Sequence, residues 1–361
     1  MNKSLRSKIK GMVLFTLNTC DRVEFPVNIK YICRHQPGVR LIPYSKQMQK
    51  YNLSYSEMLE QAETEDAFTI YDAKKDKYLI FYNDLDQEIM GTNRYRWNIA
   101  HELGHVMLGH HKRSKKTKIF RNSLSKNEYN ALEDEADYFA SYILVPYSVL
   151  HYANPTSPSQ LRNICKISNK AAKIRYKEFL IWRSKNPKAL YDSMVRKIFA
   201  KDCFKKFCNN CGSSIITKKN ISFCPICGKE ELKWGNGTMI YKKYDTHEDI
   251  NKVKICLNCD NEETNIAGDF CQICGKPLVN KCDDRGWDNY PSDDGRPCGK
   301  PVPSNARYCP YCGGKTTFLN DGVLEEWEVE RKEQEAEDEL NNKMDRYMNI
   351  PDGLDEELPF N

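Results

Sequence analysis

Apolar positions in the first ninety residues recur with helical spacing in some segments and with strand-like spacing in others. Residues 54–62 have helical spacing behind Ser54, which can cap the helix. Residues 67–71 and 78–82 are rich in β-branched and aromatic side chains and are joined by the polar sequence DAKKDK, which predicts a β-hairpin. Residues 40–43 are a third strand candidate. We therefore expect a small antiparallel sheet accompanied by helices.

Two longer helical patterns follow this sheet. They cover residues 94–112 and 128–143, and the second pattern has one continuous apolar side. Pro146 and the sequence NPTSPS then interrupt the helical spacing. We expect residues 1–155 to form one α+β domain.

Charge is sorted by region in the rest of the chain. Residues 156–205 are helical in pattern and basic. Residues 319–361 form an acidic tail, which holds 15 acidic and 4 basic side chains from Asn320 onward. Within this tail we expect a solvated helix over residues 325–348 and disorder after Pro351.

The composition is that of a soluble protein with more than one domain. The 361 residues are 40% apolar and 29% charged, and the formal net charge is +5. No apolar run approaches the roughly 20 residues that a membrane-spanning helix needs. The basic N-terminus leads into the apolar run GMVLFTL, but no small-residue cleavage site follows it, so a signal peptide is not predicted. These features favour a cytoplasmic protein.

Sixteen cysteines are present, and twelve of them lie between Cys208 and Cys312, mostly in CxxC pairs. In a reducing compartment such pairs indicate metal thiolates, since two pairs supply the four ligands of a structural zinc ion. Two units are regular, and in the third the residues 283–297 are predicted to form a loop that extends the first pair. The predicted ligands are Cys208, Cys211, Cys224 and Cys227 in ribbon 1 (residues 206–234), Cys256, Cys259, Cys271 and Cys274 in ribbon 2 (residues 254–280), and Cys282, Cys298, Cys309 and Cys312 in ribbon 3 (residues 281–318).

A site of another kind is indicated by an HExxH sequence, which runs from His101 to His105. Residues four apart on a helix share one face, so both imidazoles can reach a single metal ion. Glu102 lies about 100° around the helix, beside that ion, where a carboxylate can take a proton from water as the catalytic base. A catalytic zinc ion needs three protein ligands and an open fourth position. The motif alone supplies two of the three.

The third ligand is predicted to come from the second long helix, which contains EDEADYFASYILVP. Glu133 is favoured because Asp137, four residues later on the same face, can accept a hydrogen bond from a ligand histidine. Glu135 is a competitor, although it lies about 200° from Glu133 around the helix. Another alternative is His111, at the third-histidine position of an HExxHxxGxxH site, but Leu108 occupies the place of the required glycine.

The segments RWNIAHELGHVMLGH and LEDEADYFASYILVP resemble the two defining helices of the ImmA/IrrE family of bacterial metallopeptidases. The preceding order of helix, strand and hairpin is similar as well. The resemblance implies a zincin-like peptidase domain in which Glu133 is the third zinc ligand. It also implies a protein substrate, a small helix-turn-helix repressor whose destruction switches on mobile-element or stress genes.

We therefore expect a zinc endopeptidase with one catalytic and two to three structural zinc ions. The ribbons and the basic helices of residues 156–205 are candidate surfaces for nucleic acid or for a protein partner. Two alternatives stay open: a zinc-ribbon regulator whose peptidase activity is secondary, and a toxin or defence component that cleaves a cellular protein. The intact HExxH sequence favours catalysis, because a purely structural descendant has no need for Glu102.

Overall fold

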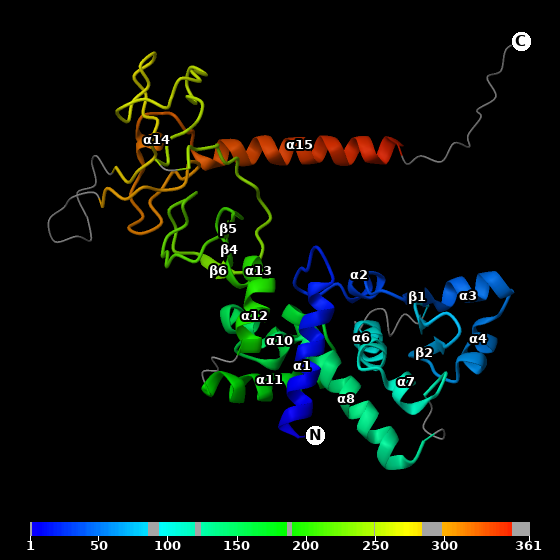
Figure 1. The fold of residues 1–361 in the computed structure, drawn as a ribbon. Coiled ribbons are helices and arrows are strands. Elements are labelled where there is room, and N and C mark those ends of the chain that lie inside the picture. Colours follow the sequence, from blue (N-terminus) through cyan, green and yellow to red (C-terminus); the bar gives the residue numbers. More distant parts are fainter. Residues whose placement is uncertain are drawn as a thin grey trace, which may run out of the picture. The chain divides into compact units, whose positions relative to one another are not determined.

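The structure is a computed structural model that describes residues 2–85, 94–119, 124–185, 190–248, 250–283 and 298–348. The chain divides into two compact units, unit 1 (Met1–Phe204) and unit 2 (Lys205–Asn361), which are described one at a time (Figure 1). The loop predicted at residues 283–297 (apart from Asp283) and the disorder predicted after Pro351 lie outside the described residues. The finer division into six segments stays a prediction. No helix within the described ranges is both long and apolar enough to cross a membrane.

Unit 1 contains a three-stranded sheet in the order β1-β3-β2, formed by β1 (Val39–Pro43), β2 (Ala67–Asp72) and β3 (Lys77–Tyr82). Strands β2 and β3 form the predicted antiparallel hairpin. Strand β1 runs parallel to β3, so the prediction of a purely antiparallel sheet is wrong and the sheet is mixed. The alternation of side chains indicates which residues share a face of a strand, but it carries no information on the direction of a neighbouring strand.

Helix α6 (Arg94–Met107) packs on β2 and β3 on one side and on α8 (Lys126–Leu144) on the other. The buried side chains of Leu103 and Phe139 belong to the core of this unit. The two helices come close because α6 has a glycine at the crossing: a Cβ added to Gly104 would lie 3.1 Å from the backbone of Ala136. This close approach brings the HExxH residues up to the acidic residues of α8.

The single helix predicted over residues 94–112 is interrupted. Helix α6 ends at Met107, Gly109 adopts a left-handed conformation with φ of 67°, and a short helix α7 (His110–Ser114) begins in a new direction. Glycine adopts a left-handed conformation at little cost in free energy, so the chain can turn at this position. The second predicted helix is present as α8, and Ser125 and Glu128 form a capping box at its start.

The remaining helices of unit 1 surround this centre (Figure 1). Helix α1 packs against α8 and α12, α2 packs against β1 and α6, and α9 contacts α11, α12 and α13. The four cysteines outside the ribbons, Cys20, Cys33, Cys165 and Cys203, are buried in this unit. These helices are α1 (Lys3–Asn18), α2 (Ile29–Arg34), α3 (Tyr44–Tyr51), α4 (Tyr55–Ala62), α9 (Tyr147–Ala153), α10 (Pro158–Cys165), α11 (Asn169–Ser184), α12 (Leu190–Ile198) and α13 (Ala200–Phe204).

Unit 2 has little regular structure and is organised around its cysteines. Its sheet has the order β5-β4-β6, formed by β4 (Lys205–Cys208), β5 (Ser214–Ile216) and β6 (Leu232–Trp234). A short helix α14 (Thr317–Asn320) is followed by the predicted acidic helix, observed as α15 (Trp327–Met348).

The first residues of the predicted acidic tail pack into unit 2. Leu324 is buried in the core cluster that contains Cys256 and Cys271, and Trp327 packs against the cluster around Cys208. Glu330 of α15 forms an ion pair of 2.8 Å with the buried Arg307. The count of charges predicts none of these contacts, because each depends on single side chains within an otherwise solvated segment.

Candidate metal centre

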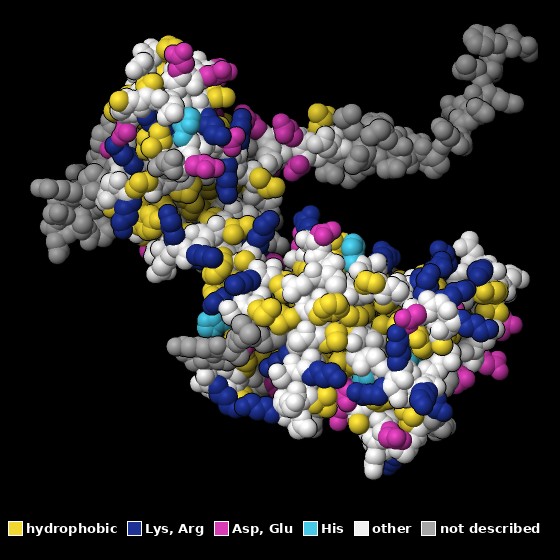
Figure 2. Space-filling model, viewed as in Figure 1, with side chains coloured by type: hydrophobic (Ala, Val, Ile, Leu, Met, Phe, Trp, Pro, Cys, Tyr) yellow, Lys and Arg dark blue, Asp and Glu magenta, His cyan; other side chains and the backbone are white. Residues whose placement is uncertain are grey.

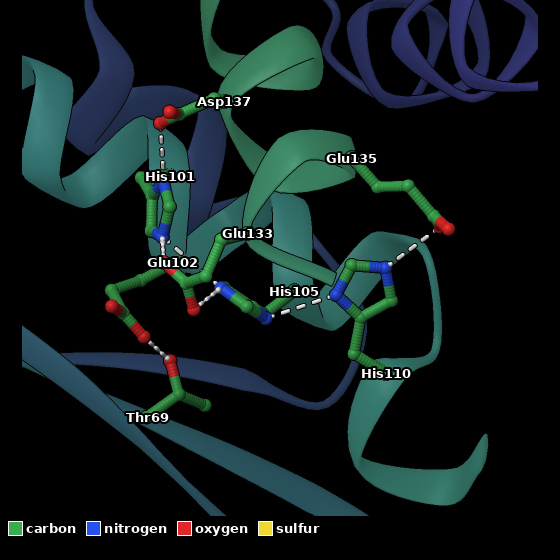
Figure 3. Close-up of polar contacts among 8 residues, drawn as sticks. All are labelled: Thr69, His101, Glu102, His105, His110, Glu133, Glu135 and Asp137. Carbon is green, nitrogen blue, oxygen red and sulfur yellow. Dashed lines mark hydrogen bonds and ion pairs between the residues drawn. The ribbon is translucent and has the colours of Figure 1, made fainter. Parts of the chain in front are cut away.

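The two histidines of the HExxH sequence and one glutamate of α8 converge on a single point (Figure 3). His101 Nε2 lies 3.2 Å from Glu133 Oε2, and His105 Nε2 lies 3.4 Å from Glu133 Oε1. The two Nε2 atoms are 3.1 Å apart. All three donor atoms lie within 4.8 Å of one another, a separation that fits three ligands of one metal ion.

The outer nitrogen of His101 is held by a carboxylate from α8. His101 Nδ1 lies 2.9 Å from Asp137 Oδ1, one helical turn beyond Glu133. Burial opposes the protonated form of His101, but hydrogen bonds to Asp137 and Glu133 outweigh burial and raise its pKa to about 10. For Glu133 burial also opposes the charged form, and its contacts with His101 and His105 lower its pKa below the ordinary value. The raised pKa of His101 reflects the carboxylates around its ring, and the lowered pKa of Glu133 reflects the two histidines beside it, so this carboxylate is ionised and can balance the charge of a cation.

The outer nitrogen of His105 is held by a residue that sequence reasoning missed. His105 Nδ1 lies 2.9 Å from His110 Nδ1, and His110 Nε2 lies 3.1 Å from Glu135 Oε2 (Figure 3). Arg113 donates to the same Glu135 oxygen at 3.0 Å. The side chain of His110 is fully buried. The buried side chains of His110 and Glu135 therefore link His105 to the partly exposed Arg113 in a chain of hydrogen bonds.

The proton positions along this chain follow from the residue types. Burial, together with the neighbouring His105 and Arg113, lowers the pKa of His110 to about 2, so its ring is neutral and carries one N–H. That N–H belongs on Nε2, where it donates to the carboxylate of Glu135. Nδ1 of His110 then accepts a hydrogen bond from the Nδ1–H of His105. The Nε2 lone pair of His105 stays free and points to the place where the ligand atoms of His101, His105 and Glu133 converge.

Glu102, the predicted base, lies beside the three donors and is fixed by the sheet. Thr69 of β2 donates a hydrogen bond of 2.6 Å from its hydroxyl to Glu102 Oε2 (Figure 3). Thr69 is buried on the face of β2 that α6 covers. The β-branched residue that helped to predict this strand therefore also positions the carboxylate.

A cavity of about 480 Å³ opens over these residues. It is formed by the start of β2, the middle of α6, the first half of α8 and the segment that follows α7. Its size suits a few residues of an extended peptide better than a folded domain. The lining includes His101, Glu102, His105, Glu133 and Asp137, together with Thr69, Trp97, Asn98, Lys118 and Tyr129.

The two alternative ligands lie elsewhere. Glu135 faces His110 and Arg113 and not the donor group. His111 packs against the rings of Tyr71 and Tyr78, and its Nδ1 faces the carbonyl of Lys116 at 3.2 Å. His111 lines the cavity but is outside the convergent group of donors.

Unit 2 brings together the cysteines of all three ribbons, including the atypical third one. Each cluster has Sγ–Sγ separations such as 3.5 Å between Cys208 and Cys227, 3.6 Å between Cys256 and Cys274, and 3.5 Å between Cys282 and Cys312. Four sulfur atoms at this spacing can hold one tetrahedral metal ion and leave no open position. This closed geometry is compatible with the structural role that the spacing of the cysteines predicts.

Comparison with known families agrees with this geometry. Residues 50–176 match the family model described as the IrrE N-terminal-like domain, Peptidase M78. The match contains the HExxH helix, the donor glutamate and the strand that carries Thr69. No curated protein is similar enough to the chain to be matched. The matched residues form a metallopeptidase domain of the ImmA/IrrE family, and the chain has metallopeptidase-type function.

Proposed function

We propose that the protein is a zinc-dependent endopeptidase, in which His101, His105 and Glu133 hold the zinc ion and Glu102 is the general base. One observation carries the proposal: three donors converge at the floor of the cavity, and the outer nitrogen of each histidine is held by a hydrogen bond. A merely structural centre needs neither the cavity nor a carboxylate fixed beside it.

The donor set fits zinc. Two imidazoles and one carboxylate are three of the ligands that zinc prefers, and three protein ligands leave a fourth position for water or substrate. When bound, the zinc ion supplies Lewis-acid chemistry, because it polarises the scissile carbonyl and lowers the pKa of water to about 7. The four-cysteine clusters fit three further, structural zinc ions.

The chain itself contributes proton transfer and orientation. Glu102 accepts a proton from the attacking water on its free carboxylate oxygen, while Thr69 holds the other oxygen. The same carboxyl group then delivers the proton to the nitrogen of the leaving amine. Because the hydroxyl of Thr69 stays in place during both transfers, the carboxylate does not have to reorient.

The outer edge of β2 is suited to hold the substrate extended. Tyr71 N–H points away from β3 and donates to Thr117 O at 2.8 Å, so the backbone groups of Thr69 and Ala67 point to the same outer side. Both residues line the cavity. A substrate segment can pair with this edge as an added strand, which would align its peptide bonds over the donors.

The substrate that we propose is a helix-turn-helix repressor, and the support for it is the family of the peptidase domain. A peptidase that itself binds DNA would reach a DNA-bound repressor most readily. The basic helices α10 to α13 and the ribbons are candidates for such contacts. A toxin or defence component with another cellular substrate is the second candidate, and substrate identification separates the two.

The test compares the wild-type protein with Glu102→Gln on repressors encoded next to its gene, with products read by mass spectrometry. We expect a single cleavage by the wild type, and a loss of about 10²- to 10⁴-fold in the variant with zinc content unchanged. Glu60→Gln, an exposed glutamate of α4 away from the cavity, is the matched control and should cleave normally.

Cleavage by Glu102→Gln at the wild-type rate refutes the assigned base. If the wild type leaves every neighbouring repressor intact but cleaves another cellular protein, the peptidase assignment stands and the repressor is the wrong substrate.

A further inference from the structure

The second cysteine pair of each ribbon has the same local structure. The three sequences are SFCPICGK from Ser222, DFCQICGK from Asp269 and RYCPYCGG from Arg307. In each, the first cysteine donates its N–H to the carbonyl five residues later, and the glycine after the pair donates to the carbonyl of the first cysteine. We call these three segments knuckles 1, 2 and 3.

Knuckles 1 and 3 bind each other through their backbones. The carbonyl of Pro310 in knuckle 3 accepts the N–H groups of Ser222 and Phe223, both at 3.1 Å. In return the carbonyl of Pro225 in knuckle 1 accepts the N–H groups of Arg307 at 2.8 Å and of Tyr308 at 3.0 Å. Each hydrogen bond on one side has its counterpart at the equivalent position on the other.

The side chains repeat this reciprocity. A Cβ added to Gly228 would lie 2.9 Å from the ring of Tyr308, and a Cβ added to Gly313 would lie 2.8 Å from the ring of Phe223. The aromatic residue before the cysteine pair of one knuckle therefore covers the glycine after the pair of the other. The contact is a local pseudo-twofold, and every element that it needs is present in each partner.

Knuckle 2 has the same elements and leaves them open. Phe270 is 59% exposed and Ile273 is 71% exposed, whereas Ile226 at the equivalent place in knuckle 1 is 3% exposed. A Cβ added to Gly275 would meet no atom within 4 Å. Within the described part of the chain, the N–H groups of Asp269 and Phe270 and the carbonyl of Gln272 have no hydrogen-bond partner.

The open knuckle lies at one end of unit 2. In Figure 1 the residues of ribbon 2, drawn in yellow, form loops at the opposite end of this unit from the strands β4, β5 and β6. Figure 2 shows hydrophobic side chains on the surface at that end. Exposed apolar side chains that surround unpaired backbone groups indicate a binding surface.

We propose that knuckle 2 is a dimerisation surface, which binds knuckle 2 of a second copy of this chain. The occupant follows from the interface that the chain already makes between knuckles 1 and 3. A surface that pairs with its own equivalent around a twofold is complementary to itself, and a second copy presents the same surface in the same geometry. Phe270 of each copy would cover Gly275 of the other, and the carbonyl of Gln272 would accept the partner's N–H groups.

The charges around the surface permit this contact. The carboxylate of Asp269, which would approach the twofold axis, forms an ion pair of 3.1 Å with Lys281 in its own chain. The small size of the surface limits the affinity of the proposed dimer. Few apolar side chains are exposed, so the buried area falls below the roughly 1,200 Å² of a stable interface, and the dimer is expected to be weak and dependent on concentration.

The test is sedimentation velocity of the full zinc-loaded chain over a concentration series from the low micromolar range upward. We expect the wild type to pass from monomer to dimer. The double variant Phe270→Ser, Ile273→Ser should have a dissociation constant at least about thirtyfold higher. Ile240→Ser removes another apolar side chain of unit 2, 77% exposed and outside the knuckles, and should dimerise like the wild type.

A second variant separates the interface from the stability of ribbon 2. Gly275→Asn introduces a residue that tolerates the positive φ of 74° at this position. Its side chain would fill the place that the partner's ring would take, so this variant should also weaken the dimer. The zinc content of each variant is measured on the same samples, because an unfolded ribbon would lose its metal ion.

Photo-crosslinking from position 270 identifies the partner surface. A crosslink to residues 272–276 of the other copy supports the proposal. A wild type that stays monomeric at every concentration overturns it, as does a double variant that dimerises like the wild type. Crosslinks confined to another protein, or to another part of the second copy, also overturn it. None of these readings depends on peptidase activity.

Discussion

The chain of polar groups behind His105 predicts how much metal affinity depends on a residue that does not touch the metal ion. His110→Ala removes the acceptor of the His105 Nδ1–H and leaves Glu135 and Arg113 paired only with each other. The buried Nδ1–H of His105 then has no partner, which costs about 1–3 kcal/mol. The substitution also frees the imidazole of His105 to rotate and to place its proton on Nε2, the metal-binding nitrogen.

The size of the effect follows from these two losses. Removal of a hydrogen-bonding partner of a ligand histidine lowers metal affinity by about 10- to 100-fold, which corresponds to about 1.4–2.7 kcal/mol. His110 is fully buried and makes both of its ring hydrogen bonds to protein atoms, so we expect a value near the upper end. The assay is competition with a chromophoric chelator, with the full chain in which the cysteine clusters stay loaded.

Two further substitutions separate hydrogen bonding from packing. His110→Phe fills the space but cannot accept or donate, so it should bind zinc as weakly as His110→Ala. His110→Gln can accept from His105 and donate to Glu135, so it should recover part of the affinity. The reasoning is refuted if His110→Ala binds zinc like the wild type. It is also refuted if the phenylalanine variant recovers the affinity and the glutamine variant does not.

Three other predictions follow from the site. Thr69→Val removes the hydrogen bond to Glu102 but keeps the β-branched shape, so kcat should fall about 10- to 100-fold with zinc content unchanged, and a loss of zinc instead would contradict the assigned role. Cys282→Ser should lower the zinc content, measured by elemental analysis, from four to three per chain, and an unchanged count would show that the third cluster is not a zinc site. Because the pKa of His101 is raised to about 10, this residue is protonated at neutral pH and zinc must displace a proton. The apparent affinity of the catalytic centre should therefore rise about tenfold per pH unit from about pH 7 to about pH 9, and a flat profile would show that His101 is already neutral.

Local spacing was enough to predict those parts of the site that depend on one element at a time. The i, i+4 spacing of His101 and His105, and of Glu133 and Asp137, holds on any helix, and the structure brings these residues together. The hairpin of β2 and β3 is also local. The direction of β1 is not, because it depends on how α3 and α4 carry the chain between distant strands.

His110 could not be predicted on the assumption of one continuous helix. On such a helix His110 lies about 140° around the axis from His105 and points away from it. The left-handed conformation of Gly109 ends α6 and turns the next residues back, which places the two rings in contact. A glycine close to the end of the helical pattern was the available signal. The pairing of knuckles 1 and 3 was hidden for a similar reason, since their aromatic and glycine residues also serve each ribbon locally.

The close crossing at Gly104 sets the distance between α6 and α8, and this distance limits the size of the ion that the three proposed ligands can bind together. The histidines belong to one helix and Glu133 to the other, so the separation of the two backbones decides which cations all three donors can reach at once. Metal–ligand distances tolerate changes of only about 0.2 Å. A side chain at position 104 would meet the Ala136 backbone at 3.1 Å, and relief of that contact requires a shift of a few tenths of an ångström. If the three residues hold the ion as proposed, the choice of ion depends on Gly104, which has no side chain and would contact neither the ion nor the substrate.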